Sequence, residues 1–233
     1  MWKAPYLGIA TDGDADRLGV IDDKAEFLHP NKILVLLYYY LMRYRGWRGA
    51  AVRNLATTHL LDRIAEDFGE TCYEVPVGFK YVSAKMVETG AIIGGESSGG
   101  LTVRGHIQGK DGIYAAALLV EAIAKTGRRL SALWDEITQK YGAAEMAEHD
   151  FHFSSAERTR IFKLLMEDKQ LPEFPCEIAK VSYMDGCKVY FKNGGWVIAR
   201  FSGTEPLLRV FCEMDTMENA EKIAKILTEF LSL

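Results

Sequence analysis

Three aspartates crowd into one short turn near the start of the chain, and this turn constrains the local fold more than any other feature. Asp12, Asp14 and Asp16 alternate with small residues between two apolar runs, residues 6–10 and 18–21, which we expect to be strands. Carboxylates this close repel one another unless a cation neutralises them. With no His or Cys in the loop, the ligand set favours Mg²⁺ or Ca²⁺ over zinc. The sequence therefore predicts a hard-cation site.

Two alternatives to this metal site stay open. A helix-loop-helix calcium site also opens with alternating aspartates, but it needs Gly at its sixth position and Glu at its twelfth. Arg17 and Asp23 stand at those positions, and the flanking runs resemble strands. The other alternative is a solvated acidic turn without a metal, which so short a motif does not exclude.

Composition and charge place the chain among ordinary globular proteins. Its 233 residues, 48% hydrophobic and 26% charged, suffice for one or two domains. The net charge of −4 offers no basic field for nucleic acid. The longest apolar run, residues 33–42, is too short to cross a bilayer, and no secretory signal precedes it. Cys72, Cys176, Cys187 and Cys212 show no paired spacing, so we expect reduced thiols, a cytoplasmic location and no membrane partner.

Strands and helices alternate through the middle of the chain. The expected strands are residues 50–54, 71–76 and 91–94, and the expected helices are residues 31–45, 59–68, about 80–88, 113–125 and 130–141. Asp111 and Ser131 are expected to cap the last two helices. This alternation predicts an α/β sheet unit, and the small polar segment 143–150 predicts a domain boundary.

The last third of the chain has a different pattern. A helix is expected from Ser154 or Ser155 to about residue 169. Four strands follow in quick succession, at residues 178–184, 188–191, 196–201 and 208–213, and a helix at residues 217–231 ends the chain. The Asp-Gly and Asn-Gly pairs at residues 185–186 and 193–194 are hairpin signals. The pattern predicts a small α+β domain.

A glycine-rich loop at residues 94–100 reads Gly-Gly-Glu-Ser-Ser-Gly-Gly. Four glycines allow close backbone approach, and they are more than a simple turn requires. Glu96 and Ser98 supply a charged acceptor and a small donor-acceptor, which suit sugar hydroxyls. A flexible hairpin tip is the alternative interpretation.

A second loop, at residues 200–206, reads Arg-Phe-Ser-Gly-Thr-Glu-Pro, with Arg209 three residues further on. Its hydroxyl and backbone N–H donors, with two arginines, favour phosphate binding. The alternative is a strand-to-strand turn with incidental surface arginines.

The three loops, in this order, resemble those of the α-D-phosphohexomutase superfamily, whose members interconvert 1- and 6-phosphosugars. The resemblance covers almost the whole chain, and it implies that Asp12, Asp14 and Asp16 are Mg²⁺ ligands. It also implies that Arg17 lies beside the reacting phosphoryl group. Lys110 lies in a Lys-Asp-Gly motif similar to that of phosphoglucomutases, which implies a catalytic role.

The same resemblance assigns the substrate contacts. Glu96 and Ser98 match the pair that contacts sugar hydroxyls. Gly78 and Lys80 lie in a Gly-x-Lys turn that senses sugar orientation. The residues that match the loop for the non-reacting phosphate are Arg200, Ser202, Gly203, Thr204 and Arg209. The Gly-Phe-Lys turn and the Lys-Asp-Gly motif favour glucose or mannose phosphates over aminosugar phosphates.

Two departures from the family pattern are visible. Gly100 stands where many members have His, so one sugar or proton-transfer contact is lost or supplied elsewhere. The Thr-Ala-Ser-His-Asn-Pro type of loop, which carries a phosphorylated serine in the family's first domain, does not occur in the sequence. The resemblance therefore implies a C-terminal fragment: residues 1–22 end the second mutase domain and carry the metal loop, residues 23–145 form an α/β sugar-binding domain, and residues 146–233 form an α+β phosphate-binding domain.

The leading hypothesis is the C-terminal part of a phosphoglucomutase or phosphomannomutase, an intramolecular phosphotransferase acting through hexose 1,6-bisphosphate. Its partners would be hexose phosphates and the missing N-terminal mutase domains. We expect this chain alone to be inactive because the serine nucleophile is lacking. A non-catalytic sugar-phosphate-binding module and a metal-dependent phosphatase stay open as alternatives, although a phosphatase would leave the loops at 94–100 and 200–206 unexplained.

Overall fold

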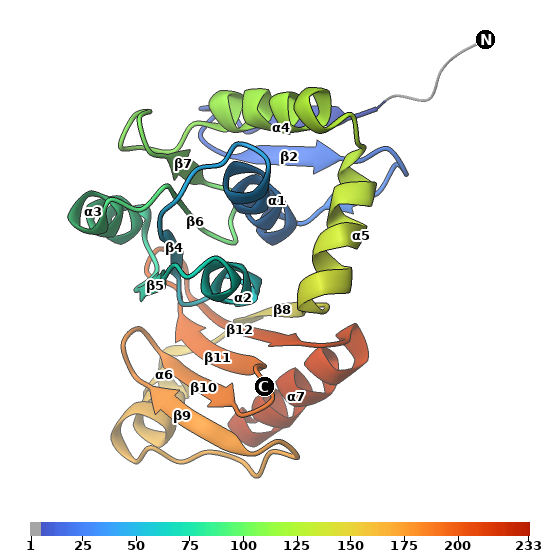
Figure 1. Ribbon diagram of the computed structural model, residues 1–233. Helices are drawn as coiled ribbons and strands as arrows, with labels where there is room; N and C mark the ends of the chain where they lie inside the picture. The colour runs from blue at the N-terminus through green and yellow to red at the C-terminus, as the bar shows by residue number, and fades with distance from the viewer. Residues whose placement is uncertain (1–5) are drawn as a thin grey trace. The chain divides into compact units, whose positions relative to one another are not determined.

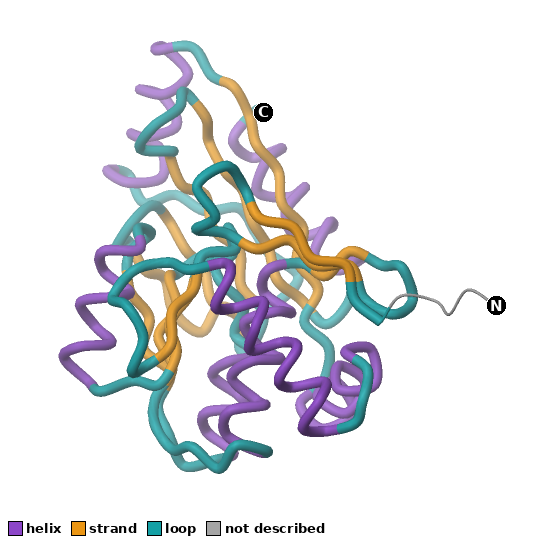
Figure 2. The backbone as a smooth tube through the Cα atoms, turned by 90° about the horizontal axis from the view of Figure 1, so that it is seen from above, coloured by secondary structure: helices purple, strands orange, loops and turns teal. Residues whose placement is uncertain are grey.

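The computed structural model describes residues 6–233, which form two compact units that divide between Gly142 and Ala143 (Figure 1). Figure 2 colours helices purple and strands orange, and it shows both kinds of element throughout the chain. The fold is mixed α/β, as the sequence predicts. Within the described part of the chain, no helix combines the length and apolar character needed to cross a membrane.

The aspartate-rich turn joins two antiparallel strands, β1 (Gly8–Thr11) and β2 (Leu18–Ile21). This agrees with the expected strands, except that β1 begins two residues later. A short strand that was not expected, β3 (Phe27–Leu28), pairs with β2. The turn between β2 and β3 closes on the buried Asp22, whose Oδ1 accepts the Lys24 N–H at 2.8 Å. The result is a three-stranded sheet with the metal loop at one end.

A second sheet in the first unit has the strand order β5-β4-β6-β7. Its strands are β4 (Ala51–Asn54), β5 (Cys72–Val75), β6 (Ile93–Gly95) and β7 (Leu101–Val103). The helices of this unit are α1 (Pro30–Arg43), α2 (Leu60–Asp67), α3 (Phe79–Thr89), α4 (Gly112–Thr126) and α5 (Leu130–Tyr141). β4 is parallel to β5 and β6, whereas β7, which was not expected, is antiparallel to β6. The α/β unit is therefore confirmed, with one added edge strand.

Two adjacent glycines in β6 let helices approach the sheet from both sides. A Cβ at Gly94 would lie 2.6 Å from Val82 of α3, and a Cβ at Gly95 would lie 2.8 Å from Leu34 of α1. Successive residues of a strand face opposite sides of the sheet, so α3 and α1 cover opposite faces. This packing fixes the end of β6, from which the glycine-rich loop continues.

The expected helix caps were right in one case and wrong in the other. Asp111 caps α4, because its Oδ1 accepts the Tyr114 N–H at 2.8 Å. Ser131 does not cap α5, which begins at Leu130 without a side-chain cap. The Ser131 hydroxyl instead donates to Asp23 at 2.8 Å, because that carboxylate in the turn after β2 is a stronger acceptor. Ser131 therefore ties α5 to the small sheet.

The second unit is built on an antiparallel sheet with the order β8-β12-β11-β10-β9. Its strands are β8 (Glu145–His152), β9 (Ile178–Ser182), β10 (Cys187–Phe191), β11 (Trp196–Phe201) and β12 (Leu207–Met214). Its helices are α6 (Ser155–Phe162), which continues into the π-helical segment η1 (Lys163–Glu167), and α7 (Met217–Leu231). The expected hairpins and helices are present. The segment 143–150, where a domain boundary was expected, contains most of β8, which pairs with β12 along its whole length.

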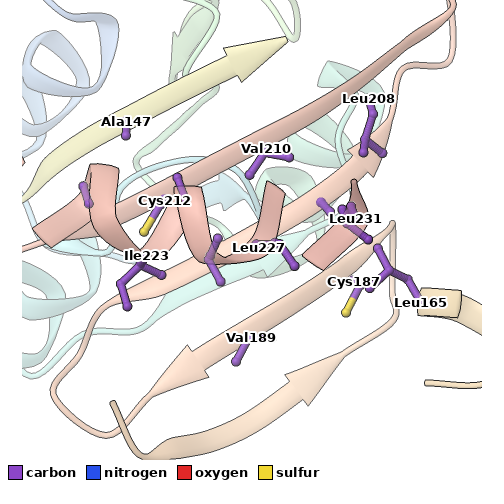
Figure 3. Packing of buried hydrophobic residues seen from close by; sticks show 14 of the residues in the cluster. Ala147, Leu165, Cys187, Val189, Leu208, Val210, Cys212, Ile223, Leu227 and Leu231 are labelled. Atoms are coloured by element: carbon purple, nitrogen blue, oxygen red, sulfur yellow. The ribbon is translucent and has the colours of Figure 1, made fainter. Parts of the chain in front are cut away.

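The core of the second unit lies between α7 and one face of this sheet (Figure 3). Leu227 of α7 and Val210 of β12 are almost completely buried, and Val189 of β10 packs in the same cluster. Leu165 of η1 adds to it from the other helical segment. This packing supports β11 and β12, which carry Arg200 and Arg209 beside the loop 200–206, named here the phosphate loop for its predicted function.

Candidate functional site

The three aspartates of the first turn lie close enough to share one metal ion. Asp12, Asp14 and Asp16 each offer a carboxylate oxygen, and these oxygens lie within 4.8 Å of one another. The turn is closed by the Ala15 N–H, which donates to the Asp12 carbonyl at 3.1 Å, with Ala15 in the left-handed region at φ 58°. Three hard oxygen ligands on one small loop fit Mg²⁺ or Ca²⁺. Their assignment as ligands stays a prediction.

Two cationic side chains already balance part of this negative charge. Arg17 Nε donates to Asp12 Oδ2 at 2.5 Å and lies 3.5 Å from Asp16 Oδ1, while Lys110 Nζ pairs with Asp16. The hydrogen bond from the Arg17 side chain holds the pKa of Asp12 below its ordinary value. A metal ion that binds here therefore competes with Arg17 and Lys110 for ionised carboxylates.

The metal loop is docked against the start of α4. The Gly112 N–H donates to the Ala15 carbonyl at 2.9 Å, and a Cβ at Gly112 would lie 2.6 Å from the Arg17 carbonyl oxygen. Arg17 also forms a β-bridge with Gly100, the last residue of the glycine-rich loop. Figure 1 shows α4 running beside β2. The structure thus brings the aspartate-rich loop together with the glycine-rich loop and Lys110, which follow it far along the sequence.

Gly100 is a glycine because the stem of Lys110 fills the space beside it. A Cβ at Gly100 would lie 2.9 Å from Lys110 Cγ and still closer to its Cδ. A larger side chain at this position would displace Lys110 from its ion pair with Asp16. The departure noted at Gly100 is therefore linked to the presence of a lysine at position 110.

Glu96 of the glycine-rich loop is held by two hydrogen bonds to one of its oxygens. Glu96 is 8% exposed, and its Oε1 accepts from Asn54 Nδ2 at 3.0 Å and from the Gly78 N–H at 2.9 Å. The Ser97 N–H donates to Thr57 Oγ1 at 3.0 Å. Asn54 and Thr57 were not predicted as site residues, although polar residues at the end of a buried parallel strand are a usable signal.

Of the other three residues assigned to the sugar, Ser98 and Lys80 are exposed and Gly78 is half-buried. Ser98 lies at the tip of the glycine-rich loop. Lys80 lies in the first turn of α3, where its Nζ is 4.9 Å from the centre of the Tyr81 ring. Gly78, which precedes this helix, has φ 131°, a conformation that favours glycine. Their roles stay predictions.

The phosphate loop lies in the second unit, whereas the other candidate residues all lie in the first. Arg200 Nε donates to Asp185 Oδ2 at 2.8 Å, and Arg209 Nη2 donates to Glu205 Oε2 at 3.1 Å. The remaining members of the loop are Ser202, Gly203 and Thr204, and the Thr204 N–H donates to Ser202 Oγ at 3.4 Å. Hydroxyl groups of the turn and guanidinium groups of the two flanking strands are donors of the kind that bind anions, and the assignment of these residues to phosphate stays a prediction.

Comparison with known proteins identifies the family of the chain. The profile described as "Phosphoglucomutase/phosphomannomutase, alpha/beta/alpha domain III" matches residues 29–141, and the profile for the C-terminal domain of the same family matches residues 162–230. The chain belongs to the phosphoglucomutase/phosphomannomutase family.

Relatives and solved structures give the same result. The chain is 33% identical over 220 residues to a phosphoglucomutase/phosphomannomutase of Thermococcus kodakarensis, covering 94% of this chain and 46% of that protein. It is 29% identical to a phosphoglucomutase of Komagataeibacter xylinus, covering 96% of this chain and 43% of that protein. The crystal structure of a putative phosphomannomutase from Thermus thermophilus superposes with a TM-score of 0.79 at 31% identity, covering 99% of this chain and 47% of the other. The chain spans about half the length of the curated relatives it matches.

Proposed function

We propose that this chain supplies the metal loop, the sugar-binding loops and the phosphate loop of a phosphohexomutase. The reaction is the interconversion of hexose 1-phosphate and hexose 6-phosphate, of the glucose or mannose type, through a hexose 1,6-bisphosphate. The observation that carries the proposal is the meeting of Asp16, Lys110 and Gly100 in the first unit. A turn with only a structural role would not need the aspartate-rich loop, the glycine-rich loop and a lysine to meet at one place.

Each part has a role in phosphoryl transfer. Asp12, Asp14 and Asp16 would hold Mg²⁺, which when bound supplies positive charge to stabilise the transferring phosphoryl group. Arg17 and Lys110 add fixed positive charge at the same place. Lys110 can also exchange a proton with a sugar oxygen, because an ammonium group donates hydrogen bonds and can lose a proton.

The substrate would be held at both ends. Glu96 and Ser98 accept from and donate to sugar hydroxyls, and the turn containing Gly78 and Lys80 lies against Glu96 through the Gly78 N–H. The loop with Arg200 and Arg209 would bind the phosphate that does not react. Binding at both ends positions the other phosphate for transfer.

The nucleophile of this reaction is a phosphorylated serine in the family that the chain resembles, and no segment of that type occurs in the sequence. We therefore propose that the chain binds hexose phosphates and Mg²⁺ but does not turn over by itself. N-terminal mutase domains are the partner that would complete it. A cytoplasmic location is part of the proposal, and the four free cysteines are consistent with it.

Binding and turnover are measured separately. NMR titration with glucose 6-phosphate, mannose 6-phosphate and glucose should show binding of the two phosphates and little binding of the free sugar. A coupled assay from glucose 1-phosphate to glucose 6-phosphate should show no turnover, with or without glucose 1,6-bisphosphate. Turnover that disappears with Asp14→Ala would show that a nucleophile is present in this chain. Hydrolysis of an aryl phosphate with Mg²⁺ would favour a phosphatase instead.

A further inference from the structure

Asn54 ends β4 with its side chain almost completely buried, at 2% exposure, and this side chain makes three hydrogen bonds. Its Oδ1 accepts the Ala56 N–H at 2.9 Å and the Thr57 hydroxyl at 2.9 Å. Its Nδ2 donates to Glu96 Oε1 at 3.0 Å. The amide cannot be turned over without losing its hydrogen bonds to the Ala56 N–H, which only donates, and to the Glu96 carboxylate, which only accepts. The orientation of the Asn54 amide is therefore determined by its surroundings.

In this arrangement one oxygen of the Glu96 carboxylate accepts hydrogen bonds from the protein and the other is left for a ligand. Oε1 accepts from both Asn54 and the Gly78 N–H. Oε2 receives no hydrogen bond from the described residues 6–233. It is not completely buried, so a ligand can reach it. A carboxylate with one oxygen fixed by two donors presents the other oxygen in a set direction.

The same contacts join three separate segments. Oε1 of Glu96 links the end of β4 to the turn before α3, because Gly78 is the residue that precedes that helix. Thr57 Oγ1 adds a second link, since it donates to Asn54 and accepts the Ser97 N–H at 3.0 Å. The glycine-rich loop and the Gly78 turn are thus held by one buried polar network centred on Asn54.

We propose that Asn54 is a positioning residue of the sugar site. It holds Glu96 so that Oε2 faces the sugar hydroxyl, and it couples the Gly78 turn to the glycine-rich loop, so that both recognise one sugar orientation. The inference rests on the proposed function, because it names how that sugar site is fixed. The Asn54 amide is an uncharged donor, so it holds Glu96 without neutralising the negative charge of that carboxylate.

The variant Asn54→Asp tests this proposal, because the only heavy atom it changes is the amide nitrogen, which becomes a carboxylate oxygen. It keeps the Oδ1 acceptor for Ala56 and Thr57 but replaces the donor to Glu96 with a negatively charged acceptor. The groups whose contacts with Glu96 are described are uncharged: the Asn54 amide, the Gly78 N–H, and the backbone of Gly99 and Gly100. Two carboxylates at hydrogen-bonding distance titrate as a pair, with one pKa raised.

We expect Asn54→Asp to weaken glucose 6-phosphate binding about tenfold or more at pH 7.5, the loss that one hydrogen bond to a charged group carries. Binding should recover in part as the pH is lowered, because the pair then shares a proton. Carbon-13 NMR of the carboxyl groups should show the pKa of Glu96 raised, and the Gly78 amide should exchange faster. Inorganic phosphate, which has no sugar, should bind as it does to the wild type.

The matched control is Asn193→Asp, the same substitution in an exposed turn of the second unit, which should leave all these values unchanged. If Asn54→Asp does not fold at neutral pH, Asn54→Ala replaces it, with the same loss of affinity and no recovery at lower pH. Unchanged glucose 6-phosphate affinity in a folded variant, with Glu96 titrating as in the wild type, would overturn the proposal. Absence of sugar-phosphate binding by the wild type would overturn the proposed function, while the Glu96 titration still decides whether Asn54 positions that carboxylate.

Discussion

Arg200 of β11 and Arg209 of β12 are direct cross-strand partners, so their side chains leave the same face of the sheet beside the loop 202–206. Each guanidinium group is bonded to a carboxylate: Arg200 to Asp185 at 2.8 Å, and Arg209 to Glu205 at 3.1 Å. A phosphate that binds at this loop must therefore compete with acidic side chains for the same donors. The loop is preformed but not free of competing charge.

Removing the competing charge at position 205 should strengthen phosphate binding. In Glu205→Gln the neutral amide holds Arg209 less strongly, while Asp150 stays 3.8 Å from Arg209 Nε, and we expect the affinity for inorganic phosphate to rise about fivefold. Arg209→Ala should lower the affinity about tenfold or more, because a charge-assisted donor is lost. NMR titration of the loop amides with phosphate measures both. Glu177→Gln, which removes an exposed carboxylate paired with Lys192, is the control and should change nothing. Equal affinities of the wild type and Arg209→Ala would refute the assignment of this loop.

The local signals in the sequence were sufficient for most elements of the fold. Hairpin signals and apolar periodicity located the strands of the second unit, and alternation located the α/β unit. The strand β8 was missed because charged and small residues dominate it, and its strand character depends on pairing with β12. β7 was missed for a related reason, since three residues beside a glycine-rich loop carry little periodicity.

The residues that hold the site in place were harder to predict than the residues that act in it. Asp16 and Glu96 were identified by their loops, but the ion pair between Asp16 and Lys110 joins segments more than ninety positions apart. Asn54 is a buried amide at the end of a strand, and its importance depends on which loop folds over it. Contacts between distant segments depend on tertiary structure, which short motifs do not encode.

Metal binding to this chain should be weak, with a dissociation constant of about 1 mM for Mg²⁺, because Arg17 and Lys110 already occupy two of the aspartates and Mg²⁺ gives up its waters reluctantly. Lys110→Met should tighten it about fivefold by removing a competing cation from Asp16. Asp14→Asn should weaken it, because one charged ligand is lost. Calorimetry with MgCl₂ measures all three, and sub-micromolar binding by the wild type would contradict an incomplete site.

The contact between Gly100 and Lys110 makes a prediction about stability. Gly100→Ala should destabilise the chain by about 1–3 kcal/mol, because the new methyl group overlaps the lysine stem. The double variant Gly100→Ala/Lys110→Ala should recover most of this loss, since the space that the stem occupied is vacated. Urea unfolding of the four proteins in this cycle gives the coupling energy. Additive effects of the two substitutions would show that the two side chains do not compete for one space.

Arg53 of β4 should be essential for the stability of the first unit. It is 3% exposed, and it is bonded to Asp62 at 2.7 and 2.9 Å and to Glu74 at 2.6 Å. Arg53→Met removes the guanidinium group from between two carboxylates and leaves His59, 3.7 Å from Glu74, as their cationic neighbour when it is protonated, and we expect it to cost about 3–5 kcal/mol. The triple variant Arg53→Met/Asp62→Asn/Glu74→Gln removes the charges together and should regain much of the loss. Urea unfolding followed at Trp47 and Trp134 fluorescence measures these differences.

The same network predicts how stability changes with pH. Burial, the largest single effect, raises the pKa of Asp62, but the charge and the hydrogen bonds of Arg53 together with the charge of His59 outweigh it and lower the pKa below its ordinary value. A carboxyl whose pKa is lower in the folded state stabilises the fold fully above its unfolded-state pKa, about 3.9, and loses this contribution as the pH falls through the lowered value. We therefore expect the wild type to lose stability more steeply than Asp62→Asn between about pH 4 and pH 2. Urea midpoints taken every half unit of pH measure the two slopes, and parallel slopes would show that Asp62 titrates alike in the folded and unfolded chains.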